Sequence, residues 1–247
     1  MLLVDKIKVV LFDLGDTLIY FNGDWDDVLH QSSKALWKCL SKYEIHVEPD
    51  QFLQDFIKRM QNYYGNRIET LVEYSTTNVL IDTLAYHGYR NISPEIIRKT
   101  LQKMYAVSQA HWKIEPDAWE LLNWLKNNGY RMGLISNASD SDDVFALLKQ
   151  HKLTDFFEQI LISAELGIRK PHPSIFIPAI QHFSIVPEQA LMVGDTLSMD
   201  IKGAKDVGMQ TAWISRRSKP DQSSFKNYFQ PSIEIQSLSE LISILKI

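Results

Sequence analysis

The stretch VVLFDLGDTL, residues 9–18, constrains the fold more than any other part of the chain. The apolar run Val9–Phe12 is typical of a strand inside a dry sheet, yet it leads directly into Asp13. An ionised carboxylate in such a place is costly unless a cation or hydrogen bonds compensate it. On this stretch alone two interpretations stay open: Asp13 and Asp16 are ordinary turn formers, or they belong to a binding site.

Short apolar strands and amphipathic helices alternate from Pro116 to the end of the chain. Strands are expected at 130–136, 157–163, 190–195 and 210–215, and helices at 117–129, 140–151, 173–183, 199–208 and 237–247, with a bend at Pro178. Strands that alternate with helices in this way are typical of βαβ units. The sequence therefore predicts an α/β fold with a Rossmann-like core, in which helices flank a parallel sheet.

Residues 20–112 show a different pattern, in which apolar residues recur mainly at helical spacing. The expected helices cover 26–43, 49–64, 71–88 and 93–105, and no strand-like run separates them. Ser93-Pro94-Glu95 is a good helix start, with an N-cap serine and proline at the first helical position. We therefore expect an all-helical domain, residues 20–112, inserted after the first strand of a core made of residues 1–19 and 113–247.

Composition excludes some classes of function. The net charge of −4 argues against a surface for duplex nucleic acid, and the densest basic run, Arg216–Lys219, is expected to be a solvated loop. No apolar stretch has the length of a membrane span, and charges near the N-terminus argue against a secretory signal. Cys39, the one cysteine, has the helical spacing of a buried thiol. We expect a cytoplasmic protein; its oligomeric state stays open.

Polar side chains gather where the predicted strands end. Asp13 follows the first strand, the pair Ser136-Asn137 ends the second, Lys170 follows the third, Asp195 ends the fourth, and Asp200 lies in the next loop. In an open parallel sheet, ligands bind beyond the carboxyl ends of the strands. We therefore expect these side chains to form one site rather than a set of unrelated turns.

The expected set suits phosphoryl transfer. Asp13 and Asp195 can hold Mg²⁺ through carboxylate oxygens, and Asp13 has a second oxygen with which to attack phosphorus. Ser136, Asn137 and Lys170 can bind and neutralise the phosphoryl oxygens of a small phosphorylated substrate. Asp13 and Lys170 are thus the candidate catalytic residues.

The chain resembles the haloacid dehalogenase-like hydrolases, most of which are magnesium-dependent phosphatases. The four family motifs occur in order, as FDLGDTL at 12–18, LISNAS at 134–139, IRKPHPSIF at 168–176 and VGDTLSMD at 193–200. The resemblance implies hydrolysis of small phosphorylated metabolites through an aspartyl-phosphate on Asp13. It also implies Asp195 and the carbonyl of Gly15 as metal ligands, Asp200 as a supporting acid, and a helical cap in residues 20–112.

One departure from the family pattern matters. Gly15 stands where phosphatases of the family usually carry a second aspartate, which donates a proton to the leaving group, and Asp16 lies one position further on. Loss of this acid favours an alternative function, a weakly catalytic or non-catalytic domain that binds a phosphorylated ligand or a protein. A further alternative is 2-haloacid dehalogenation, although such enzymes usually have a Ser-Asn pair in the fourth motif, where this chain has Gly194-Asp195-Thr196, a cation-binding arrangement.

Overall fold

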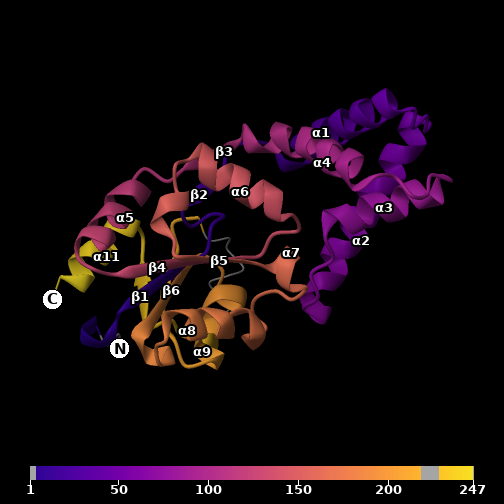
Figure 1. Ribbon diagram of the computed structural model, residues 1–247. Coiled ribbons are helices and arrows are strands. Elements are labelled where there is room, and N and C mark those ends of the chain that lie inside the picture. Colours follow the sequence, from indigo (N-terminus) through magenta and orange to yellow (C-terminus); the bar gives the residue numbers. More distant parts are fainter. Residues whose placement is uncertain (1–3, 218–227, 247) are drawn as a thin grey trace.

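A computed structural model describes residues 4–217 and 228–246, and a parallel sheet of six strands forms its centre (Figure 1). The strands are β1 (Val9–Phe12), β4 (Arg131–Ser136), β5 (Gln159–Ile162), β6 (Ala190–Gly194), β7 (Gln210–Ile214) and β8 (Ile233–Ile235). Their order in the sheet is β5-β4-β1-β6-β7-β8, and every neighbouring pair is parallel. The predicted Rossmann-like α/β core is confirmed; β8 was not predicted.

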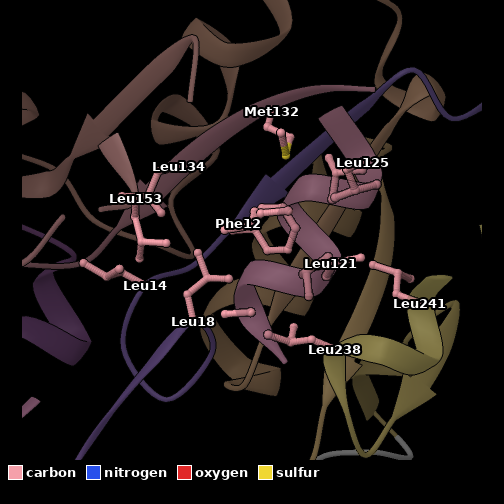
Figure 2. Close-up of a cluster of buried hydrophobic side chains, with 14 of the residues drawn as sticks. Phe12, Leu14, Leu18, Leu121, Leu125, Met132, Leu134, Leu153, Leu238 and Leu241 are labelled. Atoms are coloured by element: carbon pink, nitrogen blue, oxygen red, sulfur yellow. The ribbon is translucent and has the colours of Figure 1, made fainter. Parts of the chain in front are cut away.

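Helices cover both faces of the sheet, as its alternating side chains require. On one face lie α5 (Ala118–Asn127), α6 (Ser141–Gln150) and α11 (Leu238–Leu245), and on the other α8 (Ile177–Phe183) and α9 (Lys202–Asp206). Val10 and Phe12 of β1 point to the first face, and Val9 and Leu11 to the second. In Figure 2 the ring of Phe12 lies against α5, beside Leu121 and Leu125 of the same buried cluster.

Four helices make up most of the insert and lie beside the core (Figure 1). They are α1 (Trp25–Leu40), α2 (Pro49–Thr70), α3 (Thr76–Tyr86) and α4 (Pro94–Gln109). They enclose a hydrophobic cluster of their own, which includes Leu36, Phe52, Phe56, Leu80 and Leu101. Ser93 caps α4 as expected, with its hydroxyl accepting from the Ile96 amide at 3.3 Å, and Cys39 is buried as expected.

Some helix boundaries differ from those expected. The helix expected at 71–88 begins only at Thr76, because Val72 instead forms an antiparallel bridge with Ile168 of the core. Pro178 lies in the first turn of α8, where proline is tolerated, so the helix starts there instead of bending. In the described part of the chain, no helix combines the length and the apolar character that a membrane span needs.

Two short strands that the sequence did not predict connect the insert with the core. Strands β2 (Ile19–Phe21) and β3 (Trp112–Ile114) pair in antiparallel register, so the chain enters and leaves the insert through one ribbon. This ribbon lies at the ends of residues 20–112. The division into a core and a cap at these residues stays a prediction.

Arg216 and Arg217, the described part of the basic run at 216–219, make ion pairs that the expected solvated loop would not have. Arg216 donates to the buried carboxylate of Glu115 at 2.6 Å and also pairs with Asp117. Arg217 pairs with Glu115 too, and its guanidinium lies 3.7 Å from the ring centre of Tyr20 in β2. Ser218 and Lys219 are outside the described residues. Both arginines therefore fasten the segment after β7 to Glu115 and Asp117, which directly follow the β2–β3 ribbon.

Asp143 lies where the insert contacts the core. It is in the first turn of α6, and Gln109 at the end of α4 donates to its Oδ1 at 2.8 Å. Burial, together with the charge of Asp140, raises the pKa of Asp143 from 3.8 to about 7. Between these values the folded chain keeps a proton that the unfolded chain has released, so stability falls as pH rises through this range.

We therefore expect Asp143→Asn to stabilise the protein at pH 8 by on the order of 2 kcal/mol, and by less at pH 5. Asparagine keeps the oxygen that accepts from Gln109 but never carries the charge. Urea unfolding at the two pH values measures the difference, with the exposed Asp142→Asn as matched control. Equal or greater stability of the wild type at pH 8 would show that the folded protein tolerates the ionised carboxylate.

Candidate active site

The carboxyl ends of three neighbouring strands bring the predicted residues to one edge of the sheet. Asp13 follows β1, Ser136 ends β4 and Asp195 follows β6, and β1 lies between the other two strands. The backbone N–H of Asp13 still donates to Val193 of β6, at 2.9 Å, so Asp13 is held at the end of the ladder. The sheet therefore fixes the backbone of the site before any side chain contributes.

Three carboxylates converge at this edge. Asp13, Asp195 and Asp200 each place one oxygen within 4.8 Å of the others. Asp13 is 8% exposed and Asp200 is 1% exposed, so most of the negative charge is shielded from water. Buried carboxylates at this spacing repel one another strongly, and positive charge must be close to all three.

Lys170 supplies part of that charge. Its side chain is 1% exposed, and its Nζ lies 2.5 Å from Asp13 Oδ1 and 2.7 Å from Asp200 Oδ1. The same Nζ donates to the carbonyl of Ile135 in β4 at 2.6 Å. Burial alone would lower the pKa of Lys170, but the attraction of Asp13 and Asp200 outweighs it and raises that pKa. Lys170 is thus a fixed ammonium between two of the acids.

One lysine does not balance three acids, and the pKa shifts show this. Burial raises the pKa of Asp13 to about 6, with Asp200 adding to the rise and Lys170 opposing it. Burial also raises the pKa of Asp195 well above its usual range, with further contributions from Asp200, Asp13 and Asp16. A hard divalent cation among these oxygens would relieve the excess negative charge. The donor set therefore fits Mg²⁺.

The loop after β6 is built around Asp200. Its Oδ2 accepts from the Thr196 backbone N–H at 3.0 Å while Oδ1 faces Lys170, so both carboxylate oxygens are engaged. A side chain at Gly194 would meet Asp200 at 2.4–2.5 Å, so glycine alone fits beside this carboxylate. Trp213 Nε1 donates to the Asp195 carbonyl at 2.7 Å and holds the other end of the loop. The supporting role of Asp200 stays a prediction. Its two contacts, with Lys170 and with the Thr196 backbone, are those that such a role would need.

Asn137 has a contact that the sequence did not indicate. Its Oδ1 accepts from the Lys170 backbone N–H at 2.8 Å, and its Nδ2 donates to the Lys170 carbonyl at 3.1 Å. The amide therefore positions the residue that carries the ammonium. Ser136 is buried at the end of β4 beside this pair. Substrate binding by Ser136, Asn137 and Lys170 stays a prediction.

The turn after Asp13 carries Gly15 and Asp16. Gly15 forms an isolated bridge with Ile19, which closes the turn at the start of β2. Asp16 has a φ of 54°, in the left-handed region that aspartate adopts more readily than most residues. Its charge contributes to the raised pKa of Asp195, so Asp16 lies near the carboxylate cluster. The role of the Gly15 carbonyl as a metal ligand stays a prediction.

A buried polar cluster next to Lys170 was missed by the sequence analysis. Glu73, in the segment between α2 and α3, accepts from Arg169 at 3.1 Å and from the Ser163 hydroxyl at 2.7 Å. The hydroxyl of Tyr63 in α2 also donates to Glu73. Arg169 immediately precedes Lys170, so this cluster ties the insert to the loop that carries the ammonium. No local pattern marks Glu73, because its partners are distant in sequence.

A cavity of about 710 Å³ lies between the insert and the core, away from the carboxylates. Residues of α3, α4 and the start of α6 line it, among them Arg98, Tyr105, Gln109 and Asp140. Its lining on the core side starts at Ser139, two residues after Asn137, and the whole lining includes none of the three clustered acids. The cavity and the carboxylate site are therefore neighbouring but separate features.

Comparison with known proteins agrees with this geometry. Residues 7–208 match the model of a protein family described as haloacid dehalogenase-like hydrolase. One relative, the glyceraldehyde 3-phosphate phosphatase of Pyrococcus furiosus, is 31% identical over 219 residues, which cover 85% of this chain and 81% of the relative.

Two solved structures resemble nearly the whole chain. A HAD phosphatase from Thermococcus onnurineus has a TM-score of 0.66 and 25% identity, covering 97% of this chain and 98% of that one. A 2-haloacid dehalogenase from Pseudomonas syringae pv. Tomato has a TM-score of 0.67 and 26% identity, with the same coverage. The fold, the order of the motifs and the family match agree: the chain belongs to the haloacid dehalogenase-like hydrolase family.

Proposed function

We propose that the protein is a magnesium-dependent phosphatase that hydrolyses small phosphorylated metabolites through an aspartyl-phosphate on Asp13. The observation that supports this most is the convergence of Asp13, Asp195 and Asp200, with the ammonium of Lys170 between Asp13 and Asp200. A nucleophilic carboxylate, a cation site and a fixed positive charge are what phosphoryl transfer needs in one place. The Pyrococcus furiosus relative, a phosphatase by name, supports the same reaction class.

Asp13 is the proposed nucleophile. Lys170 binds one of its oxygens at 2.5 Å, and we assign the attack on phosphorus to the other. A bond forms between this oxygen and phosphorus as the bond from phosphorus to the leaving-group oxygen breaks. Water then attacks the phosphorus of the acyl phosphate, which releases phosphate and regenerates the Asp13 carboxylate. The ammonium of Lys170 lowers the pKa of Asp13 against the effect of burial, which favours the ionised carboxylate that a nucleophile must be.

Asp13, Asp195 and the carbonyl of Gly15 would hold Mg²⁺. When bound, the ion supplies positive charge that offsets the repulsion between the phosphoryl oxygens and the nucleophile. Asp200 keeps Lys170 directed at Asp13 and shapes the loop after β6 through Thr196. Each of the three acids then has a distinct task.

Ser136, Asn137 and Lys170 are the proposed phosphate-binding residues. Ser136 ends β4 next to β1, and Asn137 holds the backbone of Lys170, so the three form one connected group. The helical insert, residues 20–112, would act as a cap that excludes water and contacts the rest of the substrate. We expect the enzyme to work in the cytoplasm.

Two alternatives are weaker. The likeness to a 2-haloacid dehalogenase supports carbon–halogen hydrolysis, but three converging carboxylates, with the pKa values of Asp13 and Asp195 raised, make a cation site that such chemistry does not need. A non-catalytic domain that binds a phosphorylated ligand would suit the absence of an acid at Gly15. Such a domain would have no need of a nucleophile bound to a buried Lys170.

Asp13→Asn should lower kcat by about 10³-fold or more, because an amide is neither a nucleophile nor an anionic ligand. The measurement is phosphate release from an aryl phosphate in the presence of Mg²⁺. Asp155→Asn, at an exposed acid far along the chain, is the matched control and should behave as wild type. Activity of the Asp13 variant near the wild-type value would exclude Asp13 as the nucleophile.

Removal of divalent cations should abolish activity, and Mg²⁺ should restore it, because three clustered acids otherwise have one ammonium beside them, which pairs with Asp13 and Asp200. Ca²⁺ should substitute poorly, since its larger and looser coordination shell alters the geometry of attack. Asp195→Ala should weaken Mg²⁺ binding in calorimetry, whereas Asp206→Ala, an exposed acid beyond the same loop, should not. Full activity in metal-free buffer would contradict the proposal and favour dehalogenase chemistry.

A further inference from the structure

Trp112, at the other end of the insert, borders the space that a side chain at residue 15 would enter. A Cβ added to Gly15 would lie 3.4 Å from Cη2 and 3.7 Å from Cζ3 of Trp112. These two carbons are on the six-membered ring, remote from the indole N–H. The position where the family's phosphatases usually carry a proton donor therefore faces a hydrocarbon edge.

Trp112 is held in that position by its neighbours. It is the first residue of β3, and β-pairing places it opposite Phe21 of β2. The two rings meet nearly edge to face, with centroids 5.4 Å apart, and Phe21 also contacts Trp25 and His111. Trp112 is half-buried and packs against the hydrophobic cluster of the core. A Cβ at residue 15 would make ordinary van der Waals contact with the ring. Displacing the ring would disrupt this aromatic group, so a longer side chain would have to turn away from it.

We propose that Trp112 contributes to leaving-group specificity by bordering the place where the family's general acid stands and by offering its ring to a planar leaving group. The inference rests on the proposed phosphatase function. A departing alkoxide is strongly basic and needs a proton, which neither Gly15 nor the ring edge can give. An aryl oxide departs as a stable anion and can pack its flat ring against the indole. The preferred substrates are therefore phosphates of weakly basic, planar leaving groups.

This specificity differs from that of the named relative. Glyceraldehyde 3-phosphate, after which the Pyrococcus furiosus enzyme is named, is an alkyl phosphate. We expect this chain to hydrolyse it much more slowly than an aryl phosphate at the same concentration of Mg²⁺.

Four proteins test the proposal: wild type, Gly15→Asp, Trp112→Leu and the double variant. Their kcat/KM values are measured over a series of phosphates whose leaving groups run from nitrophenol to simple alcohols. The wild type should show a steep fall in rate as leaving-group pKa rises. Trp112→Leu should keep the steep fall, because it gains space but no acid. Gly15→Asp alone should keep it too, because contact with the indole would turn the new carboxyl away from the leaving group.

The double variant should have both the acid and the space for it. Its plot of log kcat/KM against leaving-group pKa should therefore be less steep than that of the wild type. Its activity on alkyl phosphates relative to aryl phosphates should rise by about 10–10³-fold, since a general acid contributes about 10²–10⁴-fold. Trp124→Leu, another half-buried tryptophan but on α5 against Tyr130, is the matched control and should leave the slope unchanged. Thermal unfolding verifies that each variant is folded. A plot flattened by Gly15→Asp alone, or a folded double variant as steep as wild type, would overturn the proposal.

A binding measurement separates this proposal from the phosphatase function itself. Phenylphosphonate and an alkylphosphonate of similar size are titrated calorimetrically into wild type and Trp112→Leu with Mg²⁺ present. The variant should lose affinity for the phenyl compound by about tenfold and keep its affinity for the alkyl compound. Equal affinities in both proteins would overturn the role of Trp112 while leaving the phosphatase function standing. Absence of binding by either compound to the wild type would count against both.

Discussion

The candidate site depends on one buried interaction, the ammonium of Lys170 held between Asp13, Asp200 and the carbonyl of Ile135. Three strands or loops that are remote in sequence meet there, and each contributes an oxygen to the same nitrogen. Removing one partner from a buried ion pair leaves an uncompensated charge. Loss of any one of these groups would therefore strongly destabilise the fold. Burial raises the pKa values of Asp13 and Asp195, and repulsion among the three acids raises them further, which supports the proposed cation.

Further contacts join the insert to the parts of the core that carry this group. Glu73 binds Arg169, the residue before Lys170, and the Thr76 hydroxyl donates to Ser139, two residues after Asn137. At the other end of the insert, Arg216 and Arg217 bind Glu115 beside the β2–β3 ribbon. A movement of the insert would therefore change the surroundings of the Lys170 loop and of the indole above Gly15. The insert in this structure is coupled to the site as well as adjacent to it.

The features that the sequence predicted are those carried by local patterns. Val9–Phe12 followed by Asp13 indicated a buried strand with an acid at its end, and convergence of parallel strands then placed Asp195 nearby. Contacts between distant residues left no such pattern. Nothing near Glu73 points to Arg169, and nothing near Gly15 points to Trp112. The three-residue strands β2 and β3 are too short for a periodicity, and charge alone could not show that Arg216 has a buried partner.

The central claim is that Asp13 becomes phosphorylated during turnover. Acid quenching during turnover of an aryl phosphate with Mg²⁺, followed by mass spectrometry of the peptides, tests it most directly. Because no acid at residue 15 assists in activating water, the aspartyl-phosphate should accumulate enough to be detected. We expect one phosphoryl group on the peptide that contains Asp13, and none in Asp13→Asn. A phosphoryl group on a different residue, or product release in a burst with no adduct on Asp13, would contradict it.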